Sequence, residues 1–202
     1  MTTARRVRRT GQPGRPGYDL DSLLSVAVKV FNERGYDGTS MEVLAERLGL
    51  SKSSIYHHVS GKSELLELAL GRALNALFAI TTESKTTTGP AIDRLEHLVR
   101  RSIEVLVAEL PYVTLLLRVR GNSKVERDAL ARRREFDEFV SGLVGEAADE
   151  GDLTPGIDPH LTARLLFGTV NSIIEWYRPR GGNSAEELAD AVIALTFSGM
   201  RA

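Results

Sequence analysis

Apolar residues along this chain recur every three or four positions, a spacing that places them on one face of an α-helix. The first such stripe consists of Leu20, Leu23, Leu24, Ala27, Val28 and Phe31. It ends at Gly35, ahead of the turn-forming pair Asp37-Gly38. We find no convincing alternation of apolar and polar residues, as a half-buried strand would require. The pattern therefore predicts an all-α protein whose first helix ends at Gly35.

Two short helices are predicted next. The second helix begins at Thr39, because Glu42 stands three residues further on and would complete a capping box. It ends before Gly49, which adopts the left-handed backbone of a sharp turn more readily than other residues. Ser51 is a natural N-cap for a third helix that continues to about His58.

Longer helices are predicted for the rest of the chain. A fourth helix follows Ser60-Gly61, and its apolar face consists of Leu65, Leu66, Ala69, Leu70, Ala73 and Leu77. The Thr-rich stretch from Thr81 to Pro90 is predicted to be a loop. Further helices are expected at about 91–109, 112–119, 124–150, 159–178 and 185–199.

The composition is that of an ordinary globular protein, with 42% apolar and 26% charged residues among 202. The absence of cysteine excludes disulfides, thiolate metal sites and a cysteine nucleophile. No apolar run approaches the ~20 residues needed to cross a bilayer, and the N-terminus lacks the apolar core of a secretory signal. We therefore expect a cytoplasmic protein that does not bind membranes.

Charge is distributed unevenly, although the net charge is only −1. Residues 1–62 contain 10 Lys or Arg against 6 Asp or Glu, whereas residues 63–202 contain 16 against 21. Five of the early positive charges precede the first acidic residue: Arg5, Arg6, Arg8, Arg9 and Arg15. A basic arm ahead of a compact segment suggests a polyanionic partner. A merely solubilising tail is the alternative, and the charge pattern leaves both open.

The segment 39–59 has the chemistry of a helix-turn-helix. Its two short helices are joined at Gly49, and the small side chain of Ala45 lets them cross closely. We expect a small core of Leu44, Leu48, Leu50, Ile55 and Val59. The outward face of the third helix is polar and consists of Lys52, Ser53, Ser54, Tyr56 and His57. A helix that reads base edges in the major groove needs such a face.

Several of these residues have a second interpretation. Tyr56 would be either a core aromatic or a contact to a phosphate or the groove wall, and the latter is favoured. His57 and His58 diverge by about 100° around a helix and cannot chelate one metal ion together. We expect one of them to face DNA and the other to pack inward. Lys62 is either an ordinary exposed lysine or, at a helix N-terminus against DNA, a phosphate contact.

The chain resembles the N-terminal domain of TetR-family regulators over about residues 20–66. The matching run comprises Phe31, Gly35-Tyr36, Gly38, Thr39-Ser40, Leu44-Ala45, Gly49 to Lys52, Ile55 to Val59, Lys62 and Leu65-Leu66. Two positions depart from the family pattern. Ser53 stands where many members have Gly, which affects the base that is met. Val59 stands where Phe is frequent, which affects packing only.

The resemblance implies a flexible basic arm at 1–18, a helix-turn-helix DNA-binding domain at 19–66 and a larger helical domain at 67–202 that dimerises and binds a small effector. It assigns phosphate contacts on double-stranded DNA to Thr39, Ser40, Tyr56, His58 and Lys62. It assigns base-edge contacts to Lys52, Ser53, Ser54 and His57. Arg15, within Gly14-Arg15-Pro16, resembles an arm residue that enters the minor groove.

The resemblance also implies that the last two long helices form the homodimer interface. Their apolar stripes are Leu165, Leu166, Val170, Ile173, Ile174, Leu188, Val192 and Leu195. Candidate effector-binding residues are Leu115, Leu116, Arg118, Phe136, Phe139, Phe167, Asn171 and Trp176. The basic residues Arg118, Arg120 and Arg132–Arg134 would either meet an anionic ligand or form a solvated face. The stretch 14–66 is also similar to regulators of fatty-acid or aromatic-acid degradation that sense CoA thioesters.

These observations favour a repressor that a small effector, such as an acyl- or aryl-CoA thioester, releases from a palindromic operator. The main alternative is an enzyme. Gly61-Lys62-Ser63 matches the end of a phosphate-binding loop, but Tyr56 stands where that motif needs Gly. No other catalytic motif is evident, so we expect no enzymatic activity, cofactor or metal site. A sequence-indifferent architectural DNA binder is disfavoured because residues 63–202 are acidic overall.

Overall fold

The computed structural model describes residues 19–198 and residue 200, and this part of the chain contains ten α-helices and no strand. The helices are α1 (Leu20–Arg34), α2 (Met41–Leu48), α3 (Lys52–Tyr56), α4 (Lys62–Ile80), α5 (Ser84–Thr87), α6 (Ala91–Ala108), α7 (Leu110–Arg118), α8 (Lys124–Asp149), α9 (Pro159–Trp176) and α10 (Ala185–Phe197). The predicted all-α fold is confirmed. Among the described residues, no helix is long and apolar enough to span a bilayer.

Most helices begin where the sequence predicts, because side chains cap their first free N–H groups. Asp19, Ser51 and Ser184 each accept a backbone N–H at the start of α1, α3 and α10. Thr39 is an exception, because α2 is capped by Ser40 instead. The Thr39 hydroxyl donates to the carbonyl oxygen of Gly35 at 2.7 Å, and this bond uses the side chain that would have capped α2.

The predicted loop from Thr81 to Pro90 is wrong in part, because it contains the short helix α5. Thr86 within it is fully buried, and its carbonyl oxygen accepts a hydrogen bond of 2.9 Å from Arg94 Nε on α6. The Thr87 hydroxyl bonds the Glu83 and Ser84 carbonyl oxygens, both at 3.2 Å. These tertiary and local bonds fold a segment whose Thr-rich composition alone predicts an irregular loop.

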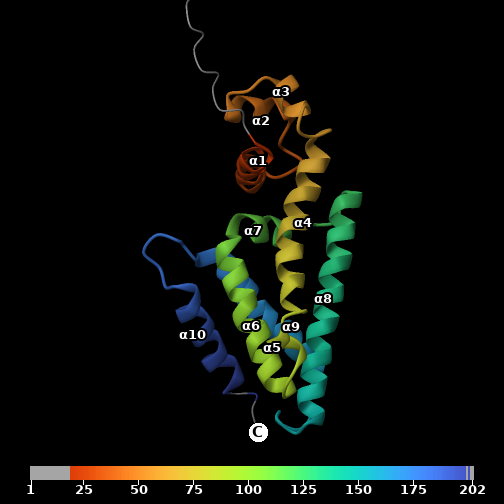
Figure 1. The fold of residues 1–202 in the computed structure, drawn as a ribbon, viewed down its shortest axis with the longest axis vertical. Helices are drawn as coiled ribbons and strands as arrows, with labels where there is room; N and C mark the ends of the chain where they lie inside the picture. The colour runs from red at the N-terminus through yellow and green to blue at the C-terminus, as the bar shows by residue number, and fades with distance from the viewer. Residues whose placement is uncertain (1–18, 199, 201–202) are drawn as a thin grey trace, which may run out of the picture.

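The N-terminal core is the buried apolar cluster shared by α1, α2, α3, the first part of α4, and α7. Its members include Leu23, Val28, Phe31, Leu44, Ile55, Leu66, Leu74, Tyr112 and Leu115. Figure 1 shows α1, α2 and α3 at one end of the molecule, with α4 leading away from them towards the other helices. Because α4 continues to Ile80, it crosses the predicted boundary at 66/67, and that boundary stays a prediction.

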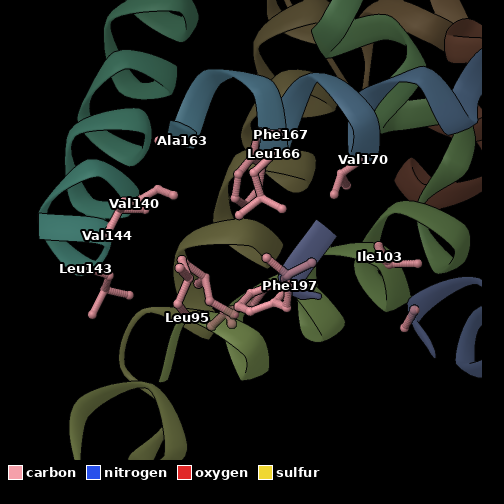
Figure 2. Packing of buried hydrophobic residues seen from close by; sticks show 14 of the residues in the cluster. Leu95, Ile103, Val140, Leu143, Val144, Ala163, Leu166, Phe167, Val170 and Phe197 are labelled. Atoms are coloured by element: carbon pink, nitrogen blue, oxygen red, sulfur yellow. The ribbon is translucent and has the colours of Figure 1, made fainter. Parts of the chain in front are cut away.

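The C-terminal core is the buried apolar cluster shared by α6, α8, α9 and α10. Figure 2 shows Phe167 and Leu166 pointing from α9 towards Leu95 of α6 and Phe197 of α10, with Val140 of α8 beside them. Phe136 packs edge-on against Phe167, with ring centroids 5.4 Å apart. The two cores lie along the same helix α4, so a movement of α4 affects both.

The predicted dimerisation stripes of α9 and α10 divide between the subunit's own core and its surface. Leu166, Val170, Ile173 and Leu188 are buried in the C-terminal core, and Ile174 and Val192 are partly buried against it. Only Leu165 and Leu195 of the predicted set are exposed, at 64% and 75%. Leu161 and Trp176 on α9 are also exposed, so this surface differs from the predicted one. The sequence pattern identifies apolar positions, but it cannot distinguish the helix face buried in the subunit's own core from the exposed face.

Candidate DNA-binding surface and effector cavity

The turn between α2 and α3 depends on a glycine. Gly49 has φ 64° and ψ 32°, a left-handed conformation that costs glycine little. The N–H of Leu50 then reaches the carbonyl oxygen of Ala45 at 3.0 Å and closes the end of α2. The chain turns sharply and enters α3 with Ser51 as its cap. This is the predicted helix-turn-helix.

The inner side of this motif holds α3 in place. Ile55 is fully buried, and Val59 just beyond α3 is 3% exposed. They pack with Leu44 and Leu48 in the N-terminal core, whereas Leu50 is only partly buried against it. The predicted small core is therefore confirmed, with Leu50 at its edge. Because α3 is short, this packing rather than its own hydrogen bonds fixes its direction.

The outer side of α3 is polar and exposed. Lys52, Ser53 and His57 are exposed, Tyr56 is 50% exposed and Ser54 is half-buried. His58 is exposed as well, so the expectation that one of the two histidines packs inward is wrong. The reason is that α3 ends at Tyr56, which places both histidines in the following turn, and the buried position is taken by Val59.

Three serine hydroxyls cluster at the start of α3. Ser51 Oγ lies 2.8 Å from Ser53 Oγ and 2.9 Å from Ser54 Oγ, and it accepts the Ser54 N–H at 3.2 Å. Ser51 is thus a cap, as predicted. The cluster orients the exposed Ser53 hydroxyl, which reduces the side-chain freedom that a DNA contact would otherwise cost.

Lys52 forms an ion pair with Glu42 across the turn between the two helices. Hydrogen bonds from Lys52 and Ser40 lower the pKa of the Glu42 carboxyl to about 2. Both side chains are largely exposed, so the pair contributes little to stability. The Lys52 ammonium can therefore exchange Glu42 for a stronger acceptor at small cost.

The two hydroxyl residues before α2 are placed differently. Ser40 is exposed, and its Oγ accepts the Val43 N–H at 3.4 Å. Thr39 is only 2% exposed, and its hydroxyl is bonded to Gly35. Its side chain is therefore not on the surface where a phosphate contact was predicted. This difference corrects the resemblance-based assignment of Thr39.

Lys62 at the start of α4 is half-buried and already has a partner. Its Nζ donates to the carbonyl oxygen of Tyr36 at 2.8 Å and lies 4.2 Å from the centre of the Tyr36 ring. Tyr36 in turn packs edge-on against Phe31 of α1. Lys62 therefore ties the N-terminus of α4 to the α1–α2 loop. An ammonium has three N–H donors, so the contact with Tyr36 leaves others for a phosphate.

A chamber of about 50 Å³ lies among α4, α6, α7, α8 and α9. Its lining is mostly apolar and includes Leu77, Val105, Leu106, Val113, Leu116, Phe136 and Phe167. Its polar lining residues are Ser102, Arg133, Asp137 and Asn171. The Ser102 hydroxyl is satisfied, because it donates to the Leu98 carbonyl oxygen at 2.7 Å. An apolar cavity with a few polar groups at one side is typical of a small-molecule site.

A groove between α8 and α9 adjoins this chamber. It shares Arg133, Asp137, Phe167 and Asn171 with the chamber. Its other polar lining side chains are Arg134, Glu138, Ser141, His160 and Arg164. Three arginines against two carboxylates make the groove net positive. The apolar chamber and the cationic groove are therefore adjacent and share part of their walls.

The predicted effector residues fall into two groups. Leu116, Phe136, Phe167 and Asn171 line the chamber. Leu115 and Arg118 lie at a separate depression between α1 and α7, where Arg118 Nη1 lies 3.5 Å from the Asn32 carbonyl oxygen. Phe139 packs against the C-terminal core, and Trp176 is exposed near the end of α9. These four residues are not brought to the chamber.

The sequence interpretation missed Asp137, His160 and Arg164 as site residues, and it named Arg133 only within a basic run. Two i, i+4 pairs, Arg133 with Asp137 and His160 with Arg164, carried the available signal. Nothing in the sequence placed these two helix faces opposite each other. Arg15, the predicted minor-groove contact, lies outside the described residues.

The fold and this surface define a class of protein, a helix-turn-helix transcriptional regulator that binds DNA. The family model for bacterial regulatory proteins of the TetR family matches residues 23–69. The model for the tetracyclin-repressor-like C-terminal domain matches residues 88–200, more than half of the chain. The chain therefore belongs to the TetR family.

Known proteins of this family are similar over nearly the whole chain. A solved TetR-family regulator, SCO3833 from Streptomyces coelicolor A3, is 59% identical with a TM-score of 0.84, over 89% of this chain and 91% of that one. The transcriptional repressor KstR2 from Mycolicibacterium smegmatis is 25% identical over 93% of both chains. AibR, solved with isovaleryl coenzyme A and operator DNA, is 25% identical with a TM-score of 0.74, over 88% of this chain and 97% of that one.

Proposed function

We propose that this chain is a cytoplasmic, homodimeric repressor that an acyl- or aryl-CoA thioester releases from a palindromic operator. The observation that carries the DNA-binding part is the exposed polar face of α3, held on the rigid N-terminal core. The observation that carries the effector part is that the apolar chamber and the cationic groove are adjacent and share four lining residues. The proposal assigns the chain no enzymatic activity.

On DNA, α3 enters the major groove. Lys52, Ser53 and His57 approach base edges, together with the half-buried Ser54 at the start of the helix. Phosphate contacts come from Ser40, Tyr56, His58 and the free donors of Lys62. Such contacts set the register and much of the affinity, whereas base contacts set the sequence preference. The arm with Arg15 would add a minor-groove contact.

Two copies of α3 are needed for a palindromic site. In a dimer they fit successive major grooves when separated by one helical turn of about 34–36 Å, or by a multiple of it. Leu161, Leu165 and Trp176 on α9 and Leu195 on α10 are more than half exposed, which is costly in water. A second copy packed on this face would bury them, and this supports the homodimer.

The chamber and groove match the two parts of a CoA thioester. The acyl or aryl group is apolar and fits a chamber lined by Leu116, Phe136 and Phe167. The CoA part carries phosphates, for which Arg134 and Arg164 of the groove offer guanidinium donors. AibR was solved with isovaleryl coenzyme A, which supports this class of effector for a chain of similar fold.

Helix α7 would carry the signal between the two sites. Leu116 lines the chamber and, like its neighbour Leu115, belongs to the N-terminal core. Asn32 of α1 also donates to the Pro111 carbonyl oxygen of α7 at 2.8 Å. An effector that favours another position of α7 therefore favours another position of α1. It shifts the equilibrium only by its difference in affinity for the two arrangements.

The proposal is tested with the purified full-length chain. Its operator is selected from a random duplex library, and binding to that operator and to an unrelated duplex is compared at one salt concentration by fluorescence anisotropy. We expect a preference of ~10³ or more for the operator. Isovaleryl-, octanoyl- and benzoyl-CoA are then added. Release by at least one of them supports the effector class, and release by none of them at millimolar concentration contradicts it.

A further inference from the structure

The junction of the chamber and the groove is formed by the four residues common to both: Arg133, Asp137, Phe167 and Asn171. We call this junction the throat. Arg133 and Asp137 lie one turn apart on α8, and Phe167 and Asn171 lie one turn apart on α9. A ligand that extends from the chamber into the groove must therefore pass one cation, one anion and one amide.

The two charges of the throat are not engaged with each other. Among residues 19–198 and 200, the side chains of Arg133 and Asp137 form no hydrogen bond and no ion pair within 4.0 Å, and it is the backbone carbonyl oxygen of Asp137, not its carboxylate, that accepts from the Ser141 hydroxyl at 2.9 Å. Other charged groups of α8 are paired: Lys124 lies 2.6 Å from Asp128, and Glu146 lies 2.6 Å from Arg94. The throat pair is thus unlike the structural ion pairs on the same helix.

The two side chains differ in exposure, because Arg133 is half-buried whereas Asp137 is exposed. Burial lowers the pKa of the Arg133 guanidinium, and the nearby Asp137 opposes that shift. Burial raises the pKa of the Asp137 carboxyl, against the effects of Arg133 and Arg164. Neither side chain has a hydrogen-bond partner among the described residues, so a ligand that supplies both an acceptor and a donor would form new hydrogen bonds at the throat.

A free acid and a thioester differ in what they offer here. The carboxylate of an acid has only acceptors and a negative charge, which Arg133 attracts and Asp137 repels. A CoA thioester is neutral at this depth: its carbonyl oxygen accepts from Arg133 or Asn171, and the first amide N–H of its pantetheine arm donates to Asp137. Only the thioester offers both an acceptor for Arg133 or Asn171 and a donor for Asp137.

We propose that Asp137 and Arg133 select the thioester form of the effector over the corresponding free acid. This inference rests on the proposed function, because it concerns the same site. Its physical basis is electrostatic. The Asp137 carboxylate repels the carboxylate of a free acid, whereas Arg133 donates a hydrogen bond to the neutral carbonyl oxygen of a thioester. The protein would thereby respond to CoA thioesters and not to the corresponding free carboxylic acids.

The test is isothermal titration of the full-length protein with isovaleryl-, octanoyl- and benzoyl-CoA and with the three matching acids. In the unaltered protein the thioesters bind more tightly than the acids. Asp137→Asn removes the repulsion, so acid binding should become about tenfold tighter or more, while thioester binding weakens or stays the same. Arg133→Gln should weaken thioester binding by about tenfold without improving acid binding, because it removes one of the two cations, Arg133 and Arg164, that offset the charge of Asp137.

Glu135→Gln is the matched control, because Glu135 is an exposed carboxylate on the same helix that lines neither cavity. It should leave the ratio of acid to thioester affinity within about twofold. If Asp137→Asn changes that ratio no more than Glu135→Gln does, the selection mechanism is wrong, although the proposed effector class stands. If none of the three thioesters binds the unaltered protein, the effector class itself is wrong, and this inference is wrong with it.

Discussion

Arg72 on α4 holds Glu109, the residue that precedes α7, through two parallel hydrogen bonds of 2.7 and 2.9 Å. The same guanidinium lies over the Tyr112 ring, 4.4 Å from its centroid. Paired bonds of this kind fix both distance and orientation. Helix α4 begins beside the helix-turn-helix, and α7 lines the chamber through Leu116, so this pair joins the two proposed sites mechanically.

Breaking this link should uncouple the effector from DNA. A bound acyl-CoA weakens operator affinity by some factor in the unaltered protein. We expect this factor to be about threefold to tenfold smaller in Glu109→Gln, a loss that lies within the usual range of coupling free energies. Operator affinity without effector should change much less. The measurement is fluorescence anisotropy with and without the acyl-CoA. Arg100→Gln, which breaks the ion pair with Asp190 between α6 and α10, is the control. Equal effects of both variants would contradict the role of Arg72 and Glu109.

Lys52 should set sequence preference rather than affinity alone. On the proposed function its ammonium exchanges Glu42 for a base edge, and loss of such a contact costs about 1–3 kcal/mol at the base that is read. Lys52→Ala should therefore relax the preference at one or two operator positions. The check is a competition assay over all single-base variants of the selected operator. Uniform weakening at every variant would assign Lys52 to the phosphates.

Lys62 should contribute to binding of every sequence alike. If one of its free donors meets a phosphate, Lys62→Ala lowers the slope of log affinity against log salt by about one unit. Lys85→Ala removes a lysine from α5, at the opposite end of the molecule from α3 (Figure 1), and should leave the slope unchanged. If Lys62→Ala has an unchanged slope and a lower thermal stability, Lys62 stabilises the fold through Tyr36 and does not contact a phosphate.

The helix-turn-helix could be predicted closely because its signals are local. Gly49 at the turn, Ser51 as a cap and Ile55 facing inward are each fixed by neighbours within a few residues. Thr39 and Ser40 mark the limit of such reasoning. Both hydroxyls can cap a helix, and only the tertiary contact with Gly35 decides that Thr39 is buried and Ser40 caps α2.

The effector cavity was predictable only in part, because its walls come from five helices. Leu115 and Leu116 are adjacent apolar residues, yet only Leu116 lines the chamber. Both belong to the N-terminal core, and a hydrophobic pattern cannot say which of the two also borders a cavity. Asp137 had only a weak signal, its i, i+4 spacing from Arg133 on a charged helix. Its proximity to Arg133 and Arg164 depends on how α8 packs against α9.

Glu126 should make the stability of the protein depend on pH. Burial disfavours its carboxylate, but the N–H groups of Arg120, Gly121 and Asn122 at 2.8 to 3.1 Å outweigh that effect and lower the pKa. A lowered pKa stabilises the fold above the unfolded value of about 4.3, and this stability is lost as pH falls through the folded value.

Glu126→Gln should therefore cost about 2 kcal/mol of unfolding free energy at pH 7, and the difference from the unaltered protein should shrink below about pH 4. Urea unfolding followed by circular dichroism at a fixed protein concentration measures both values. Glu135→Gln, at an exposed position of the same helix, should show no such cost. If the difference in unfolding free energy stays constant down to acid pH, the negative charge of Glu126 is not what stabilises its contacts with the backbone N–H groups of residues 120–122.

The exposed apolar face of α9 and α10 should control both assembly and DNA binding. Leu165→Glu or Leu195→Glu places a charge where the proposed partner copy packs, so the variant should sediment as a monomer. A monomer reads one half-site, and the loss of linked binding should weaken operator affinity about a hundredfold or more. Leu20→Glu alters an exposed leucine of α1 and should leave the sedimentation mass unchanged. A Leu165→Glu protein that still sediments as a dimer would move the interface away from this face.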